Sequence, residues 1–498
     1  MLDFTKEDFL RQYDDLKRIA AKCFENSDLE SSLKYIEICA KLGYNSNFFY
    51  TDNEIENLIF NISQKINTWF FEDFISIKGK YALIDTNGSD NHGLTQQYIR
   101  AFINANIEFI YIYGDTDLNR IKIIQEEIAA YPKGSIFTFE REYSYVEKIK
   151  LIEKLIFDYK PEKYLMHIMP WDVVAITICN ILKNVIRYNI NATDHAYWLG
   201  ASCIEYCIEF RSYGCSVSLD KRGLKREQLL LLPYYPIVNK TNFNGFPEEI
   251  SESSIKVFSG GSYYKIYGEN NVYFDLIKQF LISNDNVVLL FAGTGNNSIF
   301  EKFINSNNLH TRIFLLGNRS DINEVYESCD FYLGTYPLCG GLMSQYASYN
   351  SKPILAYTND KLPVNFIEGF VCHQSKHIIT RTSIPEFLAY GNKLCEDPEF
   401  RYNEGKELKK CLITPELFND EFKYLMSNNK SKRDFVQEII DYDVFSTLYL
   451  EVENKYLHDS QLLIGSTFRL NLLFRSPKIF INILIFLSKR FLRKKKLV

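Results

Sequence analysis

The chain has 498 residues, of which 46% are hydrophobic and 24% charged, so it is neither a disordered nor a fibrous protein and should fold as two or three units. Its formal charge of −5 is the sum of two unlike parts. Residues 460–498 contain nine basic residues and no acidic one, whereas the first 459 residues contain 62 acidic and 48 basic residues and carry −14. An acidic body of this kind excludes a nucleic-acid binder, which needs a basic surface.

The first part of the chain, residues 1–77, is predicted to be a helical appendage, because apolar residues recur there at helical spacing. The N-terminus lacks the apolar segment of a secretory signal. No uncharged apolar run reaches 18 residues, so no conventional transmembrane helix is expected. We therefore expect a cytoplasmic protein.

From residue 78, short apolar runs that end in turn residues alternate with helical stretches. One series covers residues 78–245, and a second covers residues 246–380. This alternation predicts an α/β protein with two facing domains, each a Rossmann-like, doubly wound parallel sheet. Ligands bind such sheets at the carboxyl ends of the strands, so the cleft between the domains is the expected site. Residues 381–459 should be helical and pack across the domains.

Three loops of the second series carry glycines directly after a predicted strand. Backbone N–H groups in such a loop and at a helix start can hold a diphosphate, and a lysine can add a cation. The alternative for each loop alone is a tight turn without a ligand. Together the three loops predict a nucleotide site. The candidate donor-binding residues are Gly260, Gly261, Ser262, Lys265, Gly317, Asn318, Arg319, Pro337, Gly340, Gly341, Leu342, Met343 and Ser344.

The first series offers two histidines to the cleft. His92 follows the first predicted strand, where a neutral imidazole can take a proton from an acceptor hydroxyl or amide. Alternatively, it caps the following helix or binds the acceptor without catalysing. His195 lies at the end of a later strand and is the second catalytic candidate. Asn91, Gly93 and Trp198 are expected on the acceptor side.

Two acid-x-acid pairs could hold a divalent metal, namely Asp115 with Asp117 and Asp441 with Asp443. Such spacings arise often by chance in a chain with 62 acidic residues. We therefore expect no metal ion and no cofactor. His167 lies between a methionine and an isoleucine and is expected to be a core histidine.

Four stretches, in this order, resemble the O-GlcNAc-transferase-like group of GT-B glycosyltransferases, which includes bacterial cytoplasmic N-glycosyltransferases. They are residues 89–98 (SDNHGLTQQY), 204–236, 259–266 (SGGSYYKI) and 335–341 (TYPLCGG). The resemblance implies a GT-B fold, a nucleotide-sugar donor of the UDP-sugar class, a base at His92 and a diphosphate-binding lysine at Lys265.

The chain departs from this family after the paired glycines. Where the family has threonines and an acid, this chain has Leu342, Met343, Ser344 and Ala347, and only Ser344 can still donate to a phosphate. The glutamate-rich loop of many retaining GT-B enzymes is absent, which favours inversion. We expect a hexosyl or N-acetylhexosaminyl transfer to a protein side chain or to a lipid-linked or surface glycan. The alternative is a non-catalytic glycosyltransferase-like subunit that binds acceptor and supports a catalytic partner.

The basic tail, residues 460–498, is predicted to contain an amphipathic helix. Its apolar run at 479–487 would be about 14 Å long, too short for a hydrocarbon core of about 30 Å. The tail is therefore expected to lie on an anionic membrane surface at the inner face. The alternative is a helix docked on the first domain. The apolar side chains expected on one helical side are Phe480, Ile483, Leu484, Leu487, Phe491 and Leu492.

Overall fold

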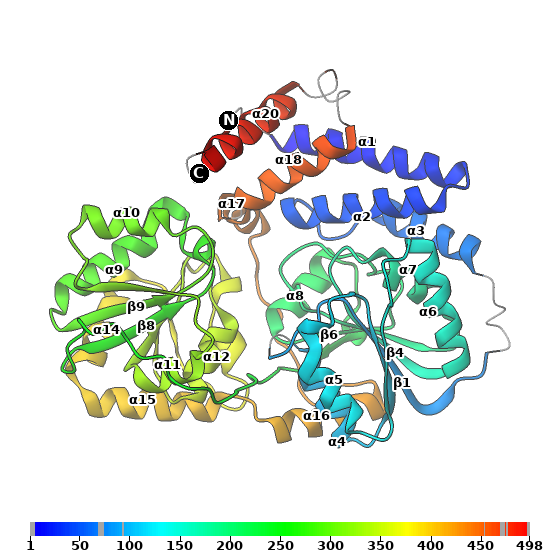
Figure 1. Ribbon diagram of the computed structural model, residues 1–498. Coiled ribbons are helices and arrows are strands. Elements are labelled where there is room, and N and C mark those ends of the chain that lie inside the picture. The colour runs from blue at the N-terminus through cyan, green and yellow to red at the C-terminus, as the bar shows by residue number, and fades with distance from the viewer. Residues whose placement is uncertain are drawn as a thin grey trace.

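Two parallel β-sheets with connecting helices form most of the protein (Figure 1). The computed structural model describes residues 5–67, 74–91, 94–452, 454–468, 474 and 477–495. The inner strands are buried over most of their length, and every residue of β9 (Val287–Ala292) is buried. A strand buried on both faces needs a continuous apolar run, which explains why VVLLFA forms one. The predicted fold class is confirmed: two Rossmann-like domains, a helical appendage and a C-terminal helical tail.

The first sheet has seven parallel strands in the order β3-β2-β1-β4-β5-β6-β7. The order reverses between β1 and β4, so the topological switch point of this domain lies between these two strands. The strands are β1 (Ile77–Asp85), β2 (Glu108–Tyr113), β3 (Gly134–Phe137), β4 (Pro161–His167), β5 (Ile186–Ile190), β6 (Tyr206–Glu209) and β7 (Leu229–Leu231). The helices are α4 (Thr95–Asn104), α5 (Lys122–Ala129), α6 (Tyr145–Tyr159), α7 (Val173–Ile181) and α8 (Ser212–Lys221).

The second sheet repeats this topology with six parallel strands in the order β10-β9-β8-β11-β12-β13. Its switch point lies between β8 and β11. The remaining strands are β8 (Ile255–Gly260), β10 (Ile313–Gly317), β11 (Phe331–Leu333), β12 (Ile354–Tyr357) and β13 (Thr380–Arg381). The helices are α9 (Val272–Ser283), α10 (Ser298–Ser306), α11 (Ile322–Ser328), α12 (Gly341–Tyr349), α13 (Glu368–Val371), α14 (Ile384–Glu396) and α15 (Pro398–Cys411).

Three helices form the appendage, which lies on the first domain (Figure 1). They are α1 (Lys6–Glu25), α2 (Leu29–Ser46) and α3 (Asn53–Ile66). Each begins at a side-chain cap: Thr5 forms a capping box, and Asp28 and Asp52 accept hydrogen bonds from the first turns of α2 and α3. Helix α3 packs on α7, and α2 packs on α6 and α7, so the appendage and the first domain share one hydrophobic core.

Two helices after the second domain return the chain to the first. Helix α16 (Pro415–Asn428) packs on α4, where the rings of Phe418 and Phe422 each lie 5.7 Å from the ring of Tyr98. Helix α17 (Tyr442–Val452) then contacts both α2 and the turns that follow β8. The two domains are therefore joined by several chain segments, which limits the ways in which the cleft can open.

The C-terminal tail docks on the appendage. Helix α18 (Asn454–Phe468) packs on α2, and α20 (Pro477–Lys495) packs on α18. Ile479 is fully buried, and Phe480 and Ile483 also pack against the core of the appendage. We expected Phe480 and Ile483 to face lipid, and the structure corrects this: they fill the seam with the appendage.

The opposite side of α20 is open. Ile481 is 41% exposed and Leu484 is 51% exposed, while Phe474, just before the helix, is 86% exposed. The side chains of Leu487, Phe491 and Leu492 lie outside the described residues. No helix in the part of the chain that the structure describes is long and apolar enough to cross a membrane.

Candidate active site between the two domains

Two of the predicted glycine loops flank the switch point of the second sheet. The loop after β8 contains Gly261 and leads into a 3-10 turn, Tyr263–Ile266, that carries Lys265. The loop after β11 leads through Pro337 to Gly340. Lys265 joins the loops, because its Nζ donates to the carbonyl of Cys339 at 3.4 Å. A switch point between neighbouring strands is where doubly wound domains bind nucleotides.

The two glycines after β8 are needed for different reasons. A Cβ at Gly260 would lie 2.7 Å from the carbonyl oxygen of Ala292, so this glycine allows the neighbouring strand to pack. Gly261 has a φ of 138°, and a Cβ there would meet nothing closer than the Lys265 side chain at 3.9 Å. Gly261 therefore leaves open space beside the lysine, and Ser262 follows it, half-buried.

Helix α12 begins at Gly341, with Gly340 as its N-cap residue and no side-chain cap. Its first N–H groups are therefore available to an anion, and Leu342 and Met343 are only half-buried there. Ser344 is fully buried, and its hydroxyl donates to the carbonyl of Gly340 at 2.9 Å. In this conformation the Ser344 hydroxyl bonds the helix backbone.

Asn365, which the sequence did not single out, holds the loop before α12. Its Nδ2 donates to the carbonyl of Pro337 at 2.7 Å, and its Oδ1 accepts from the N–H of Cys339 at 3.1 Å. The amide thus fixes the loop on both sides of Leu338. The backbone of the candidate diphosphate loop is preorganised by a side chain from a later segment.

The third glycine loop, after β10, has its cation already engaged. Gly317 has a φ of 67° and Asn318 is exposed. Arg319 forms two hydrogen bonds with Asp321, at 2.7 and 2.6 Å, and a third with the carbonyl of Gly245 at 2.9 Å. Arg319 therefore ties the interdomain linker to the second domain in this structure.

His195 faces the loops after β8 and β11 across a cavity of about 250 Å³ between the domains. The first domain contributes His195 and Arg211, and the second contributes Lys265, Gly341 and Leu342. The cavity therefore brings together predicted residues from both halves of the chain.

Asp194 supports the imidazole of His195. Its Oδ1 lies 3.1 Å from Nδ1 of His195, and its Oδ2 accepts from Nε of Arg211 at 2.5 Å. Burial opposes ionisation of Asp194, but the Arg211 charge and the two hydrogen bonds hold the pKa of this carboxyl well below its ordinary value. An ionised Asp194 favours the tautomer with hydrogen on Nδ1, which leaves Nε2 of His195 free to accept a proton.

Arg211 also connects the two domains. Its guanidinium carbon lies 3.9 Å from the centroid of the Phe370 ring, and Nη1 donates to the carbonyl of Val364 at 2.8 Å. Both partners belong to the second domain. Neither Arg211 nor Asp194 is among the candidates expected from the sequence, although an aspartate directly before a cleft histidine is a recognisable pattern.

The remaining catalytic and acceptor-side candidates are His92, Asn91, Gly93 and Trp198. His92 and Gly93 fall outside the described residues. The N–H of Asn91 donates to the side chain of Gln96 at 2.6 Å. Trp198 is only 4% exposed and lies in the core shared with the appendage, where Arg222 covers its ring at 5.2 Å, so it is a packing residue and lines none of the described cavities. His167 is buried as expected, 3.1 Å from Asp85.

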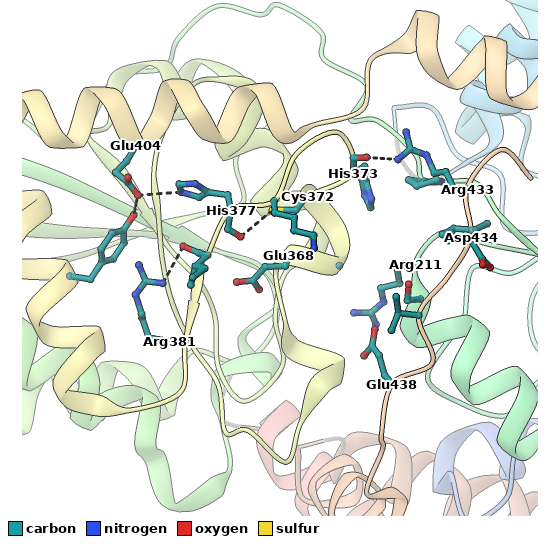
Figure 2. Close-up of a pocket in the computed structure, with 18 of the residues that line it drawn as sticks. Arg211, Glu368, Cys372, His373, His377, Arg381, Glu404, Arg433, Asp434 and Glu438 are labelled. Atoms are coloured by element: carbon teal, nitrogen blue, oxygen red, sulfur yellow. Dashed lines mark hydrogen bonds and ion pairs between the residues drawn. The ribbon is translucent and has the colours of Figure 1, made fainter.

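A larger cavity, about 1190 Å³, is also lined by Arg211 (Figure 2). Several of its charged groups already have partners. Nε2 of His377 lies 3.2 Å from Glu404, and Arg381 covers the ring of Tyr390 at 4.2 Å. None of the predicted donor or catalytic residues lines this cavity. Among the described residues, no group of three or more His, Cys, Asp or Glu side chains is placed to hold a metal ion.

Glu438, which lies near Arg211 in Figure 2, should make stability depend on pH. Burial raises the pKa of Glu438 from 4.5 to about 7; Arg211 opposes the rise and Asp194 adds to it. Between these two values the folded state keeps a proton that the unfolded state releases, so the free energy of unfolding falls as pH rises through this window. Glu438→Gln should remove this loss, and urea unfolding at pH 5 and pH 8 measures it. A pH dependence equal to that of the parent would contradict the assignment.

Comparison with protein-family models gives no match, and neither does comparison with curated sequences. Solved structures do match. An O-GlcNAc transferase from Thermobaculum terrenum has a TM-score of 0.53 and 10% identity, over 89% of this chain and 85% of its own. Anabaena HepE, in complex with UDP and glucose, has a TM-score of 0.52 and 13% identity, over 70% and 99%. S. aureus TarM has a TM-score of 0.50 and 12% identity, over 70% and 99%. The protein thus has the GT-B glycosyltransferase fold.

Proposed function

We propose that the protein transfers a sugar from a UDP-sugar to an acceptor bound between its domains. The observation that carries the proposal is the cavity in which Lys265 and the start of α12 face His195. One wall offers cationic and backbone donors for a leaving diphosphate. The other wall offers a base that a buried carboxylate orients. The similarity to UDP-bound structures of the same fold supports the choice of donor.

The proposed reaction is a single displacement that inverts the sugar carbon. The acceptor oxygen attacks C1 of the sugar on the face opposite the diphosphate, and the bond from C1 to the diphosphate oxygen breaks. The diphosphate leaves with that electron pair, and Nε2 of His195 receives the acceptor proton. Lys265 and the N–H groups of Gly341 and Leu342 stabilise the charge that develops on the diphosphate. No metal ion takes part in this proposal.

Nucleotide binding is the first test. Thermal unfolding of the full chain with UDP, ADP or GDP should show stabilisation by UDP, since a ligand that binds only the folded state raises its stability. Release of UDP from UDP-glucose or UDP-N-acetylglucosamine would then show turnover. Binding of UDP without turnover of either sugar nucleotide would favour a different sugar donor. A protein that no nucleoside diphosphate stabilises would instead be the non-catalytic subunit, an alternative that the buried Ser344 and the apolar Ala347 favour.

We also propose that the basic tail binds the protein to an anionic membrane. The exposed Ile481 and Leu484 lie on the side of α20 that faces away from the appendage, and Lys494, Lys495 and Lys496 follow in sequence. Each basic residue near an anionic surface contributes about 1 kcal/mol. Such a location would give the enzyme access to a lipid-linked acceptor.

Replacing Lys494, Lys495 and Lys496 by alanine should weaken binding to phosphatidylglycerol vesicles by roughly 100-fold, from about 3 kcal/mol of lost attraction. Co-sedimentation with vesicles measures this. The matched control replaces the three exposed α15 lysines Lys406, Lys409 and Lys410 and should bind like the parent. Equal binding of the parent to neutral phosphatidylcholine vesicles would refute an electrostatic attachment.

A further inference from the structure

A third cavity, about 360 Å³, opens at the switch point of the first sheet. Its floor is formed by residues at the carboxyl ends of β1 and β4, including Thr86 and Met169, and by Gly114 after β2. Its volume falls in the range of about 300 to 1,000 Å³ that is typical of small-molecule sites. A cavity at the switch point of an open α/β sheet is the place where such domains bind ligands.

The lining of this cavity combines aromatic rings with carboxylates. Phe139 and Tyr143 come from the segment after β3, and their rings lie 6.0 Å apart. Trp171 comes from the loop after β4 and is half-buried. The carboxylates are those of Glu30, Glu37, Glu142 and Asp172, against a single lysine, Lys148.

This chemistry selects against a phosphate and in favour of a neutral sugar. Lys41 pairs with Glu37 and Lys148 pairs with Glu142, so the four carboxylates still outnumber the ammonium groups beside them and disfavour an anionic ligand. Ionised carboxylates only accept hydrogen bonds, and the hydroxyl groups of a pyranose donate them. Aromatic side chains can stack on the apolar C–H faces of the pyranose.

Helix α2 links this cavity to the candidate active site. Glu30, Glu37 and Tyr44 recur every seven residues and therefore lie on one face of the helix. Glu30 and Glu37 line the switch-point cavity, whereas Tyr44 lines the cavity that contains His195. The rings of Tyr44 and Trp171 are in edge contact, 5.3 Å apart, at the boundary between the two cavities. The path along α2 is roughly 21 Å long.

We infer that the switch-point cavity, lined by Trp171, Tyr143 and the carboxylates of α2, binds a neutral pyranose unit of a glycan acceptor. This inference rests on the proposed function and adds the class of acceptor. The glycan lies along α2, with one unit against Trp171 and its reacting hydroxyl beyond Tyr44, at His195. The appendage is then part of the acceptor site.

The test measures binding of the full-length protein, without donor, to an array of neutral oligosaccharides of glucose, galactose, N-acetylglucosamine and N-acetylgalactosamine. We expect at least one of them to bind. Trp171→Ala and Tyr143→Ala should each weaken that binding about tenfold or more, and Trp171→Phe should retain most of it because a ring remains. Tyr402→Ala, which removes an exposed aromatic ring from α15, is the matched control and should bind like the parent.

Thermal unfolding verifies that each variant is folded. Failure of the parent to bind any glycan would overturn the inference, as would unchanged binding by both Trp171→Ala and Tyr143→Ala. These outcomes are separate from failure of the proposed function. A protein that binds UDP but no glycan keeps the transferase proposal and loses the glycan site. Binding of glycans without binding of any nucleotide would contradict the transferase proposal and support the glycan site.

Discussion

Replacing His195 by alanine should lower the rate of sugar transfer by about 10²- to 10⁴-fold, the usual contribution of a positioned general base. Affinity for UDP should stay the same, because His195 lies on the wall opposite the diphosphate loops. The side chain is about one-third exposed, at 35%, so its removal leaves little buried space unfilled. Release of UDP from UDP-glucose or UDP-N-acetylglucosamine gives the rate, and calorimetric titration with UDP gives the affinity.

Two further variants make this result specific. His310→Ala removes an exposed histidine from the second domain and should leave both measurements unchanged. His92→Ala tests the base implied by the family resemblance. Loss of turnover in His92→Ala with normal turnover in His195→Ala would move the base to the loop after β1. Asp194 is a poor site for this test, because removing one partner of its buried pair with Arg211 would cost about 3 to 5 kcal/mol of stability.

The fold could be predicted because most of its strands are buried on both faces. Apolar runs such as IEFIYIY and NVVLLFA predict β2 and β9 without reference to the rest of the chain. Strand β13 has only two residues, and β7 has three. Strands this short carry no periodicity, so only the neighbouring strand that pairs with them defines them.

The candidate site was only partly predictable. Glycines after strands indicate where a backbone can approach a ligand, and they placed the loops around Gly261 and Gly341 correctly at the ends of β8 and β11. Contacts between residues far apart in the chain have no local sequence pattern by which they could be predicted. Arg211 reaches the carbonyl of Val364, 153 positions along the chain, and Asn365 reaches back to Pro337. The double contact of Arg319 with Asp321 is likewise not visible in the sequence, which offers Arg319 only as a candidate phosphate ligand.

The docking of the C-terminal tail could also be predicted only in part. Its periodicity predicts a helix with apolar residues, and α20 is such a helix. Apolar residues lie on more than one side of it, and the side that docks depends on the surface offered by α18 and the appendage. Ile479 is buried there while Leu484 is exposed. The sequence of the tail alone does not contain that information.

Replacing Lys265 by alanine should reduce both donor affinity and turnover. A hydrogen bond to a charged group contributes about 1.5 to 3 kcal/mol, so affinity for UDP should fall roughly 10- to 100-fold. Turnover should fall further, by about 10²- to 10³-fold in total, because charge on the diphosphate grows as the bond to the sugar breaks. The fold should tolerate the change, since the ammonium group has only one hydrogen bond, at 3.4 Å, among the described contacts.

The matched control is Lys278→Ala, which removes an exposed lysine of α9 from the same domain and should change neither affinity nor turnover. It separates a local contact with the diphosphate from a general loss of positive charge. Lys265→Arg keeps the charge but replaces a compact ammonium with a planar group, and should recover affinity more than turnover. If Lys265→Ala binds UDP as the parent does and releases it from a sugar nucleotide at the same rate, the donor site does not lie at the β8–β11 switch point.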